Sequence, residues 1–170
     1  LLDSSLQNKR LGRFSFMGCS PFLIFECKNG RIAITEGSNV RSFLGDPFVC
    51  LQELLAIYKT DRTSTLPFCG GAVGYFSYDM CHYVEKLPRT AVDDVQLPDC
   101  WFGFYDSILA VDHQEQTVYL VAAGIYEKEE IAIQRLQEKL ALLQHCVFEQ
   151  PVGVACDEIM SNFSKHDYMK

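Results

Sequence analysis

Alternation of apolar and polar positions marks one element of the chain above the others. Two apolar segments rich in β-branched and aromatic residues, 22–28 and 31–35, flank the pair Asn29-Gly30. Both residues of an Asn-Gly pair tolerate positive φ, which a type I′ turn requires. Strands rich in such residues on either side of this turn are typical of a hairpin. The sequence therefore predicts a β-hairpin over residues 22–35.

Helical spacing of apolar residues appears in two places. Asp46-Pro47 offers an N-cap and a proline in the first turn of a helix. The apolar residues that follow recur every three or four positions: Val49, Leu51, Leu54, Leu55 and Tyr58. A second helix is predicted from about Lys128 to Leu143, with these residues on one face: Ile131, Leu136, Leu140 and Leu143.

Three glycines precede an aromatic run in the segment 67–79. Their spacing matches neither a Walker A loop nor GxGxxG. We interpret the segment as a strand whose glycines let another backbone or a bulky side chain approach closely. Residues 101–111 and 117–123 are predicted as two further strands, joined by residues 112–116. Together these elements predict an α+β fold, with a mixed, largely antiparallel sheet and helices packed on it.

Composition narrows the class of protein. The chain has 170 residues, of which 48% are hydrophobic and 22% charged, as in one globular domain. The formal net charge of −7 argues against nucleic-acid binding, since phosphate contacts need clustered Lys and Arg. No run of apolar residues approaches the length of a membrane span. A small metabolite or a protein partner is the expected ligand.

Eight cysteines raise the question of disulfides or zinc. No pair forms CxxC, and no short Cys-His group has zinc spacing. Several cysteines lie inside apolar runs, where a thiol behaves as a small core hydrophobe. We therefore expect reduced cysteines and a cytoplasmic protein.

Acidic residues and histidines are the remaining candidates for chemistry. Asp93, Asp94, Asp99 and Asp106 could bind Mg²⁺ or act as acid and base, but capping and turn roles are favoured. Cys81 and His82 are adjacent, and adjacent side chains rarely aim at one another, so a nucleophile–base pair is not expected. Two other histidines are expected to be solvated: His113, in a predicted turn, and His145, near a helix end.

The first residues, Leu1-Leu2-Asp3-Ser4-Ser5, lead from a strand edge into a polar loop, and Arg10 and Arg13 follow closely. A carboxylate, a hydroxyl and a cation near backbone donors can hold an α-amino acid. Turn formation is the favoured explanation of the same residues, and amino-acid binding stays open as the alternative.

The two ends of the chain suggest a larger protein. The sequence begins without Met, and Ser164 followed by Asp167 forms a capping box for a helix with only about one turn before Lys170. One turn is not stable alone. We expect residues 1–145 to form one domain, 146–163 a linker and 164–170 the start of a truncated second domain.

Several segments in this order resemble the N-terminal region of the component I family of chorismate-utilising enzymes, which includes anthranilate synthase and aminodeoxychorismate synthase. The resemblance covers most of the chain and rests on these segments: 1–4, 13–18, 70–79, 85–88, 93–99, 106–113 and 161–168. It implies a part of the anthranilate synthase component I-like fold. Gly103-Phe104-Tyr105-Asp106 and Ala91-Val92-Asp93-Asp94 look more like the aminodeoxychorismate synthase branch, which serves 4-aminobenzoate and folate biosynthesis.

The resemblance implies a function for the parent protein. A family member adds an amino group from ammonia to chorismate with Mg²⁺, and a glutamine amidotransferase subunit supplies the ammonia. The chorismate and Mg²⁺ residues belong to the C-terminal domain, so no catalytic or metal residue is expected in this chain. In the family, the first segment borders a tryptophan pocket, which implies a ligand site at Leu2, Asp3 and Ser4. Asp3 stands where many members have Glu.

Three alternatives remain. The same domain of an anthranilate synthase would use the tryptophan pocket for feedback inhibition. A free-standing amino-acid-binding module would have no catalytic partner. An unrelated small hydrolase would use Cys81 or a histidine. The expected truncation also predicts exposed apolar surface, because the sheet would lack its covering layer, and hence a tendency to associate.

Overall fold

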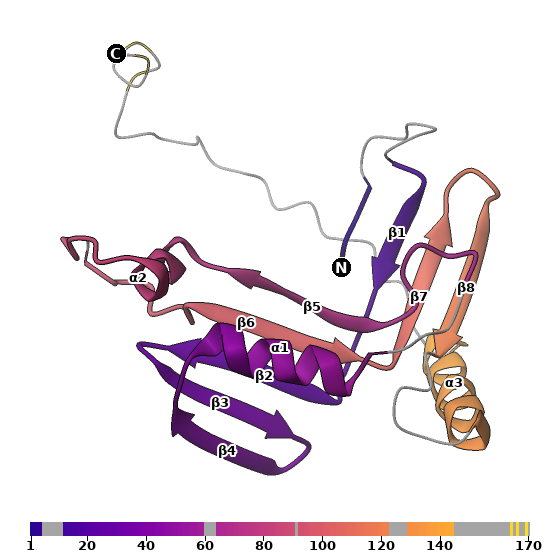
Figure 1. Cartoon of the computed structure of the whole chain (residues 1–170). Coiled ribbons are helices and arrows are strands. Elements are labelled where there is room, and N and C mark those ends of the chain that lie inside the picture. Colours follow the sequence, from indigo (N-terminus) through magenta and orange to yellow (C-terminus); the bar gives the residue numbers. More distant parts are fainter. Residues whose placement is uncertain are drawn as a thin grey trace.

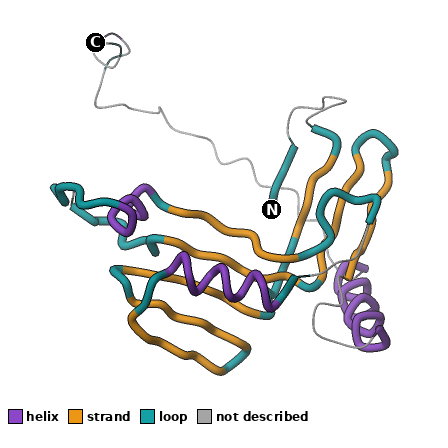
Figure 2. The backbone as a smooth tube through the Cα atoms, viewed as in Figure 1, coloured by secondary structure: helices purple, strands orange, loops and turns teal. Residues whose placement is uncertain are grey.

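Two antiparallel sheets form the body of the computed structural model, which describes residues 1–4, 12–59, 64–90, 92–122 and 129–144, together with Ser164, His166 and Met169. Figure 1 traces the order of the elements, and Figure 2 separates helices, strands and loops. The predicted linker, 146–163, lies outside the described residues, as do Arg10 and His145.

The larger sheet has five strands in the order β4-β3-β2-β6-β5. Their bounds are β2 Leu23–Lys28, β3 Arg31–Glu36, β4 Asn39–Leu44, β5 Gly71–Phe76 and β6 Cys100–Tyr105. All neighbouring strands run antiparallel. The predicted hairpin is confirmed as β2 and β3, and its two turn residues have φ values of 50° and 76°, as a type I′ turn requires.

Helix α1, Pro47–Ile57, covers one face of this sheet (Figure 1). The helix begins as predicted, because Oδ1 of Asp46 accepts hydrogen bonds from the backbone N of Phe48 at 2.8 Å and of Val49 at 3.3 Å. Leu51 and Leu54 are buried against the sheet. Two of the predicted apolar positions, Val49 and Leu55, are instead about half exposed, so the buried stripe is narrower than the sequence pattern.

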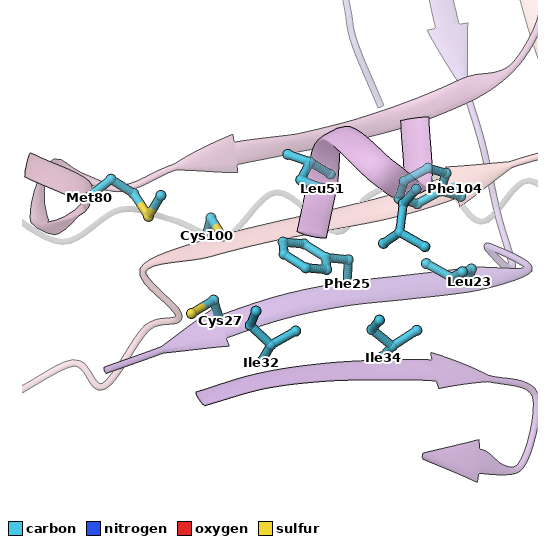
Figure 3. Packing of buried hydrophobic residues seen from close by; sticks show 10 residues of the cluster. Leu23, Phe25, Cys27, Ile32, Ile34, Leu51, Met80, Cys100 and Phe104 are labelled. Carbon is cyan, nitrogen blue, oxygen red and sulfur yellow. The ribbon is translucent and has the colours of Figure 1, made fainter. Parts of the chain in front are cut away.

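The hydrophobic core lies between α1 and the larger sheet (Figure 3). The alternating positions of β2 and β3 point into it, with Leu23, Phe25, Cys27 and Ile32 fully buried. At one end of this core, the rings of Phe22, Tyr58 and Phe104 meet at centroid distances of 5.4 to 6.1 Å. These three aromatic rings join the end of α1 to β6.

The glycine-rich segment forms β5, as predicted, and its close approach to a neighbour is confirmed at one position. A Cβ on Gly74 would lie 1.9 Å from the backbone oxygen of Trp101 and 2.7 Å from the Cα of Phe102. Both contacts are to backbone, which cannot move aside as a side chain can. Pairing of β5 with β6 therefore requires glycine at position 74.

The smaller sheet has the order β1-β7-β8, with β1 Phe14–Met17, β7 Ser107–Asp112 and β8 Thr117–Ala122. Helix α3, Glu129–Gln144, confirms the predicted second helix and packs against β8. The hairpin of β7 and β8 is also confirmed.

One predicted strand, 101–111, is wrong as a single element. The chain leaves the larger sheet at Asp106 and enters the smaller one at Ser107. The Asp106 carboxylate accepts a hydrogen bond from Ser107 Oγ at 2.9 Å and pairs with Arg135 of α3. Since the apolar pattern continues through this point, only the partners of Asp106 reveal the break.

Between β5 and β6 the chain forms a short 3₁₀ helix, Tyr78–Met80, and the single-turn helix α2, Cys81–Val84. Large apolar side chains are exposed here and on the edge strand β4, including Tyr78, Val84, Val40 and Leu44. This exposed surface agrees with the sequence expectation, and association of the chain stays a prediction. Within the described residues, no helix combines the length and apolarity needed to cross a membrane.

Candidate functional site

The first residues of the chain form an extra rung beside β1. The backbone N of Leu2 donates to the oxygen of Phe16 at 2.8 Å, and the N of Phe16 donates to the oxygen of Leu2 at 2.8 Å. This pair of bonds aligns Leu2, Asp3 and Ser4 with the strand. The predicted ligand residues thus lie together at the edge of the smaller sheet.

A single buried hydroxyl holds two of these residues in place. Ser15 is 5% exposed, and its Oγ contacts three groups: Asp3 Oδ1 at 2.9 Å, the backbone N of Ser4 at 3.0 Å and His113 Nε2 at 2.7 Å. Ser15 lies within a segment that carries the family resemblance, yet its local sequence predicts no role for it. Only the pairing of distant segments shows that Ser15 and His113 belong to this site.

His113 corrects a sequence expectation. The imidazole is half-buried rather than solvated, because the β7–β8 turn folds back onto β1. The backbone N of His113 donates to the oxygen of Arg13 at 2.8 Å. Its ring therefore meets Ser15 of β1, at the edge of the smaller sheet.

Ser4 donates its hydroxyl hydrogen to the backbone oxygen of Phe14 at 2.7 Å. Its oxygen then presents lone pairs rather than a hydrogen to an approaching ligand. Among the described residues, Asp3 uses only Oδ1 in a hydrogen bond. The side chains of these two residues thus offer acceptors, which suit a ligand that carries N–H donors.

An apolar hollow lies beside the segment, where the two sheets meet. It is lined by residues of the N-terminus, both sheets and the loop before β5: Leu1, Leu2, Phe16, Gly18, Phe68, Val73, Tyr105 and Ile108. Its volume is about 30 Å³, far below the roughly 300 Å³ of a small-molecule pocket. These residues form an open apolar wall beside Leu2 rather than an enclosed pocket.

Arg13, the cation expected near the segment, is paired with a carboxylate of the protein. Its Nη2 lies 2.7 Å from Asp112 Oδ2, and its Nε lies 3.1 Å from both carboxylate oxygens. Asp112 also accepts from the backbone N of Gln114 at 3.0 Å and of Glu115 at 3.2 Å. The Arg13 guanidinium is the main cause that lowers the Asp112 pKa from 3.8 to about 2. Arg13 therefore links β1 to the β7–β8 turn.

This ion pair predicts a specific dependence of stability on pH. A carboxylate whose pKa is lower in the folded protein stabilises it above the unfolded pKa of about 3.9. The stabilisation is lost as the pH falls from about 4 to about 2. The Asp112→Asn variant should melt at a lower temperature than wild type at pH 7, and the difference should shrink through this range. Melting curves followed by circular dichroism between pH 7 and pH 2 measure it.

The matched control is Arg13→Gln, which removes the guanidinium and keeps a polar, uncharged side chain. It should abolish most of the same pH dependence, since Arg13 is the largest cause of the Asp112 shift. A melting difference between wild type and Asp112→Asn that stays constant down to pH 2 would contradict the prediction.

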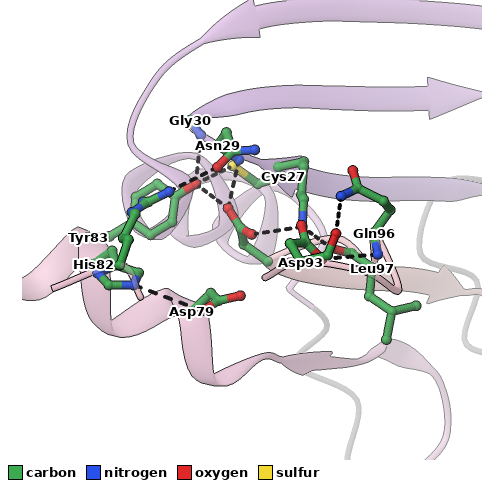
Figure 4. Close-up of polar contacts among 12 residues, drawn as sticks. Cys27, Asn29, Gly30, Asp79, His82, Tyr83, Asp93, Gln96 and Leu97 are labelled. Atoms are coloured by element: carbon green, nitrogen blue, oxygen red, sulfur yellow. Dashed lines mark hydrogen bonds and ion pairs between the residues drawn. The ribbon is translucent and has the colours of Figure 1, made fainter. Parts of the chain in front are cut away.

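Three of the acidic candidates lie in two places, Asp93 and Asp99 in one and Asp106 in the other. Asp99 is 3% exposed and accepts from the backbone N of Asn29 and the hydroxyl of Tyr83, each at 2.7 Å. Figure 4 labels these two partners, Asn29 and Tyr83. Asp93 pairs with Lys28, whose Nζ is 3.7 Å from Asp99 Oδ1. These contacts tie the tip of the β2–β3 hairpin to the segment before β6.

Turn and partner roles explain these carboxylates. Asp93 accepts from the backbone N of Gln96 at 3.0 Å, which confirms its turn role. The hydroxyl of Tyr83 also accepts from Gly30 N at 2.6 Å, and burial raises the Tyr83 pKa above its usual value. Asp106 lies apart from this cluster, with Arg135. Among the residues that the structure describes, no three acidic, His or Cys side chains gather to hold a metal ion.

The cysteines among the described residues form no disulfides. In the described ranges, six cysteines are free thiols: Cys19, Cys27, Cys50, Cys69, Cys81 and Cys100. Burial raises the pKa of Cys100 to about 12 and also raises that of Cys27, so both stay protonated at neutral pH. His82 faces Asp79 at 3.9 Å. Cys146 and Cys156 lie outside the described residues.

Comparison with known families assigns the chain to a class of enzymes. The family of chorismate binding enzymes matches residues 34–170, and the chain belongs to this family. A solved structure, anthranilate synthase component I from Streptococcus pneumoniae TIGR4, superposes with a TM-score of 0.68 at 26% identity. It covers 86% of this chain and 32% of that one. The expected fold, a part of the anthranilate synthase component I-like architecture, is confirmed.

Curated relatives carry two names. Anthranilate synthase component 1 of Acetivibrio thermocellus is 36% identical over 123 residues, which cover 71% of this chain and 25% of that protein. Aminodeoxychorismate synthase component 1 of Bacillus subtilis is 31% identical over 134 residues, 78% of this chain and 28% of that protein. The corresponding enzyme of Escherichia coli is 34% identical over 124 residues, 72% of this chain and 27% of that protein. The chain spans about a quarter of the length of these relatives.

Proposed function

We propose that this chain is the N-terminal part of an aminodeoxychorismate synthase component I. The complete enzyme would replace the 4-hydroxyl of chorismate with an amino group, using ammonia from a glutamine amidotransferase subunit. Family membership over residues 34–170 carries the proposal as far as a chorismate-utilising enzyme. The segments 91–94 and 103–106 favour this branch, and two of the relatives named above carry this name.

The described residues contribute a scaffold and a ligand segment rather than catalytic groups. No cluster of donors among them fits Mg²⁺, so we assign the metal and chorismate to the remainder of the polypeptide. We assign Leu2, Asp3 and Ser4 to a tryptophan site. The acceptors of Asp3 and Ser4 suit the ammonium of an amino acid, and the apolar wall beside Leu2 suits an indole ring.

Anthranilate synthase component I is the alternative. The relative from Acetivibrio thermocellus and the solved structure from Streptococcus pneumoniae TIGR4 both bear this name. In that case the tryptophan site would be regulatory, and the product of the complete enzyme would be anthranilate with pyruvate.

Product analysis separates the two reactions. The complete polypeptide, expressed with its own flanking sequence, is supplied with chorismate, Mg²⁺ and ammonium, and the product is identified by mass and fluorescence. Aminodeoxychorismate is the expected product. Anthranilate and pyruvate would overturn the proposal in favour of the alternative, and consumption of chorismate without amination would overturn both.

The ligand assignment makes its own prediction. Ser4→Ala removes one acceptor for the ligand ammonium, and a hydrogen bond to a charged group contributes roughly 1.5–3 kcal/mol. Tryptophan affinity, measured by calorimetry on the complete polypeptide, should fall by at least about tenfold. Ser42→Ala, an exposed serine on β4, serves as the control and should leave the affinity unchanged. Unaltered tryptophan binding in Ser4→Ala would contradict the assignment of Ser4.

A further inference from the structure

We infer that Ser15 and His113 are positioning residues that make this site selective for ligands with a free α-ammonium group. The inference rests on the proposed amino-acid site at Leu2, Asp3 and Ser4, and it deepens that proposal by naming the part of the ligand that is recognised. Three contacts to one buried oxygen carry it.

The hydrogen bonds of Ser15 can be assigned one by one. A hydroxyl has one hydrogen to donate and two lone pairs to accept with. The backbone N–H of Ser4 fills the first lone pair, at 3.0 Å. The ionised carboxylate of Asp3 is an acceptor only, so the hydroxyl hydrogen goes to Asp3 Oδ1, at 2.9 Å.

One lone pair of Ser15 then remains for His113, whose Nε2 lies 2.7 Å away. Since that lone pair can only accept, Nε2 must carry a hydrogen and donate it. The contact therefore selects the Nε2–H form of the imidazole. With this donation the one hydrogen and both lone pairs of the Ser15 hydroxyl are engaged in hydrogen bonds. The hydrogen therefore stays directed at Asp3.

His113 can act as a fixed donor because its own backbone is held from two sides. Its backbone N donates to the oxygen of Arg13 at 2.8 Å, and its backbone oxygen accepts from Gln116 Nε2 at 2.7 Å. The neighbouring Asp112 binds Arg13 and the backbone of the turn. The His113 ring therefore projects from a turn whose backbone is fixed by hydrogen bonds.

The consequence for a ligand lies at Asp3 and Ser4. Oδ1 of Asp3 is committed to Ser15, which fixes the rotation of the carboxylate and leaves Oδ2 as its one oxygen outside the hydrogen bonds of the described residues. The hydroxyl hydrogen of Ser4 is committed to Phe14. Two fixed acceptors select a donor, and an ammonium carries three N–H groups. A ligand carboxylate would meet only lone pairs at these side chains.

The test compares three ligands that share the indole ring. Tryptophan and tryptamine have an ammonium, whereas indole-3-propionate has only a carboxylate. On the complete wild-type polypeptide, calorimetry should show tighter binding of tryptophan and tryptamine than of indole-3-propionate. Ser15→Ala and His113→Ala should each lower the affinity for tryptophan and tryptamine about tenfold. The affinity for indole-3-propionate should stay unchanged.

Conservative variants separate the positioning role from general damage to the fold. The His113→Gln side chain carries an amide N–H at about the reach of Nε2, so it should restore most of the selectivity. His113→Asn is too short to reach Ser15 and should behave like His113→Ala. Control variant His82→Ala removes another histidine that lies largely inside the protein, beside Asp79, and should keep the selectivity of wild type.

The possible results separate the positioning role of Ser15 and His113 from the existence of the amino-acid site itself. If wild type binds tryptophan and the His113 variants weaken the binding of all three ligands equally, the role of His113 is structural. The positioning role is then wrong, while the amino-acid site still stands. Wild-type selectivity in His113→Ala would also overturn the inference alone. If wild type binds none of the three ligands, the amino-acid site itself is wrong.

Discussion

The Gly74→Ala variant is expected to prevent normal pairing of β5 with β6. The added Cβ would lie 1.9 Å from the backbone oxygen of Trp101, so the strands must separate or shift register. Overpacking of a rigid site costs about 3 kcal/mol at the upper end of its usual range. Since whole domains are stable by only about 5–15 kcal/mol, we expect a large fall in melting temperature and in the yield of folded protein.

Gly37→Ala is the matched control for this experiment. Gly37 lies in the turn between β3 and β4 with φ of 58°, and a Cβ there would meet nothing within 4 Å. The cost is then only that of the left-handed backbone, about 1–2 kcal/mol. The melting temperature of Gly74→Ala reports the cost of a steric clash, and that of Gly37→Ala reports the cost of the left-handed backbone. Equal destabilisation would show that β5 and β6 are not as close as the structure places them.

The Phe104→Ala variant should be the most destabilising change in the core. Phe104 lies in the core (Figure 3) and is 1% exposed. Its ring meets those of Phe22 and Tyr58. Truncation of a buried Phe costs about 3–5 kcal/mol, because transfer free energy is lost and a cavity remains. Urea unfolding followed by tyrosine and tryptophan fluorescence should show a much lower midpoint.

Phe43→Ala tests the same chemical change at the edge of the sheet. Phe43 lies on β4 and is 42% exposed, so the expected loss is well below that of Phe104→Ala. A comparable loss of unfolding free energy at both positions would mean that the deeper burial of Phe104 contributes no additional stability. A loss below about 1 kcal/mol for Phe104→Ala would contradict the core described above.

Local chemistry explains which elements were predictable from the sequence. The β2–β3 hairpin follows from two residues that tolerate positive φ, and α1 follows from a carboxylate that caps the first backbone N–H groups. In both cases the residues that decide the structure are close together in the chain. At Gly74 the missing side chain itself predicts a close neighbour, although that neighbour, Trp101, lies far along the chain.

Distant partners explain what was not predictable. The break at Asp106 depends on Arg135 of α3, and the burial of His113 depends on Ser15 of β1. No local pattern reveals a partner so far along the chain. Sequence spacing alone therefore predicted one strand where there are two, and a solvated imidazole where there is a half-buried one.

The candidate site shows the same division. The resemblance to component I proteins named Leu2, Asp3 and Ser4, and the structure brings these residues together beside β1. The serine that holds them has an ordinary sequence context, within an alternating strand. A short polar residue at a buried strand position is the one signal that could have identified Ser15, since a buried hydroxyl needs partners.

The pairing of β1 with β7 has a consequence for synthesis on the ribosome. Arg13 and its partner Asp112 are 99 positions apart, whereas β2 and β3 are joined by a two-residue turn. At roughly 5–20 residues per second, β1 emerges about 5–20 s before its partner strand. The hairpin can pair at once, but the first strand waits, exposed to other nascent chains and to chaperones. The contact between Ser15 and His113 can therefore form only after β7 has been made, although Ser15 is among the first residues of this chain to be synthesised.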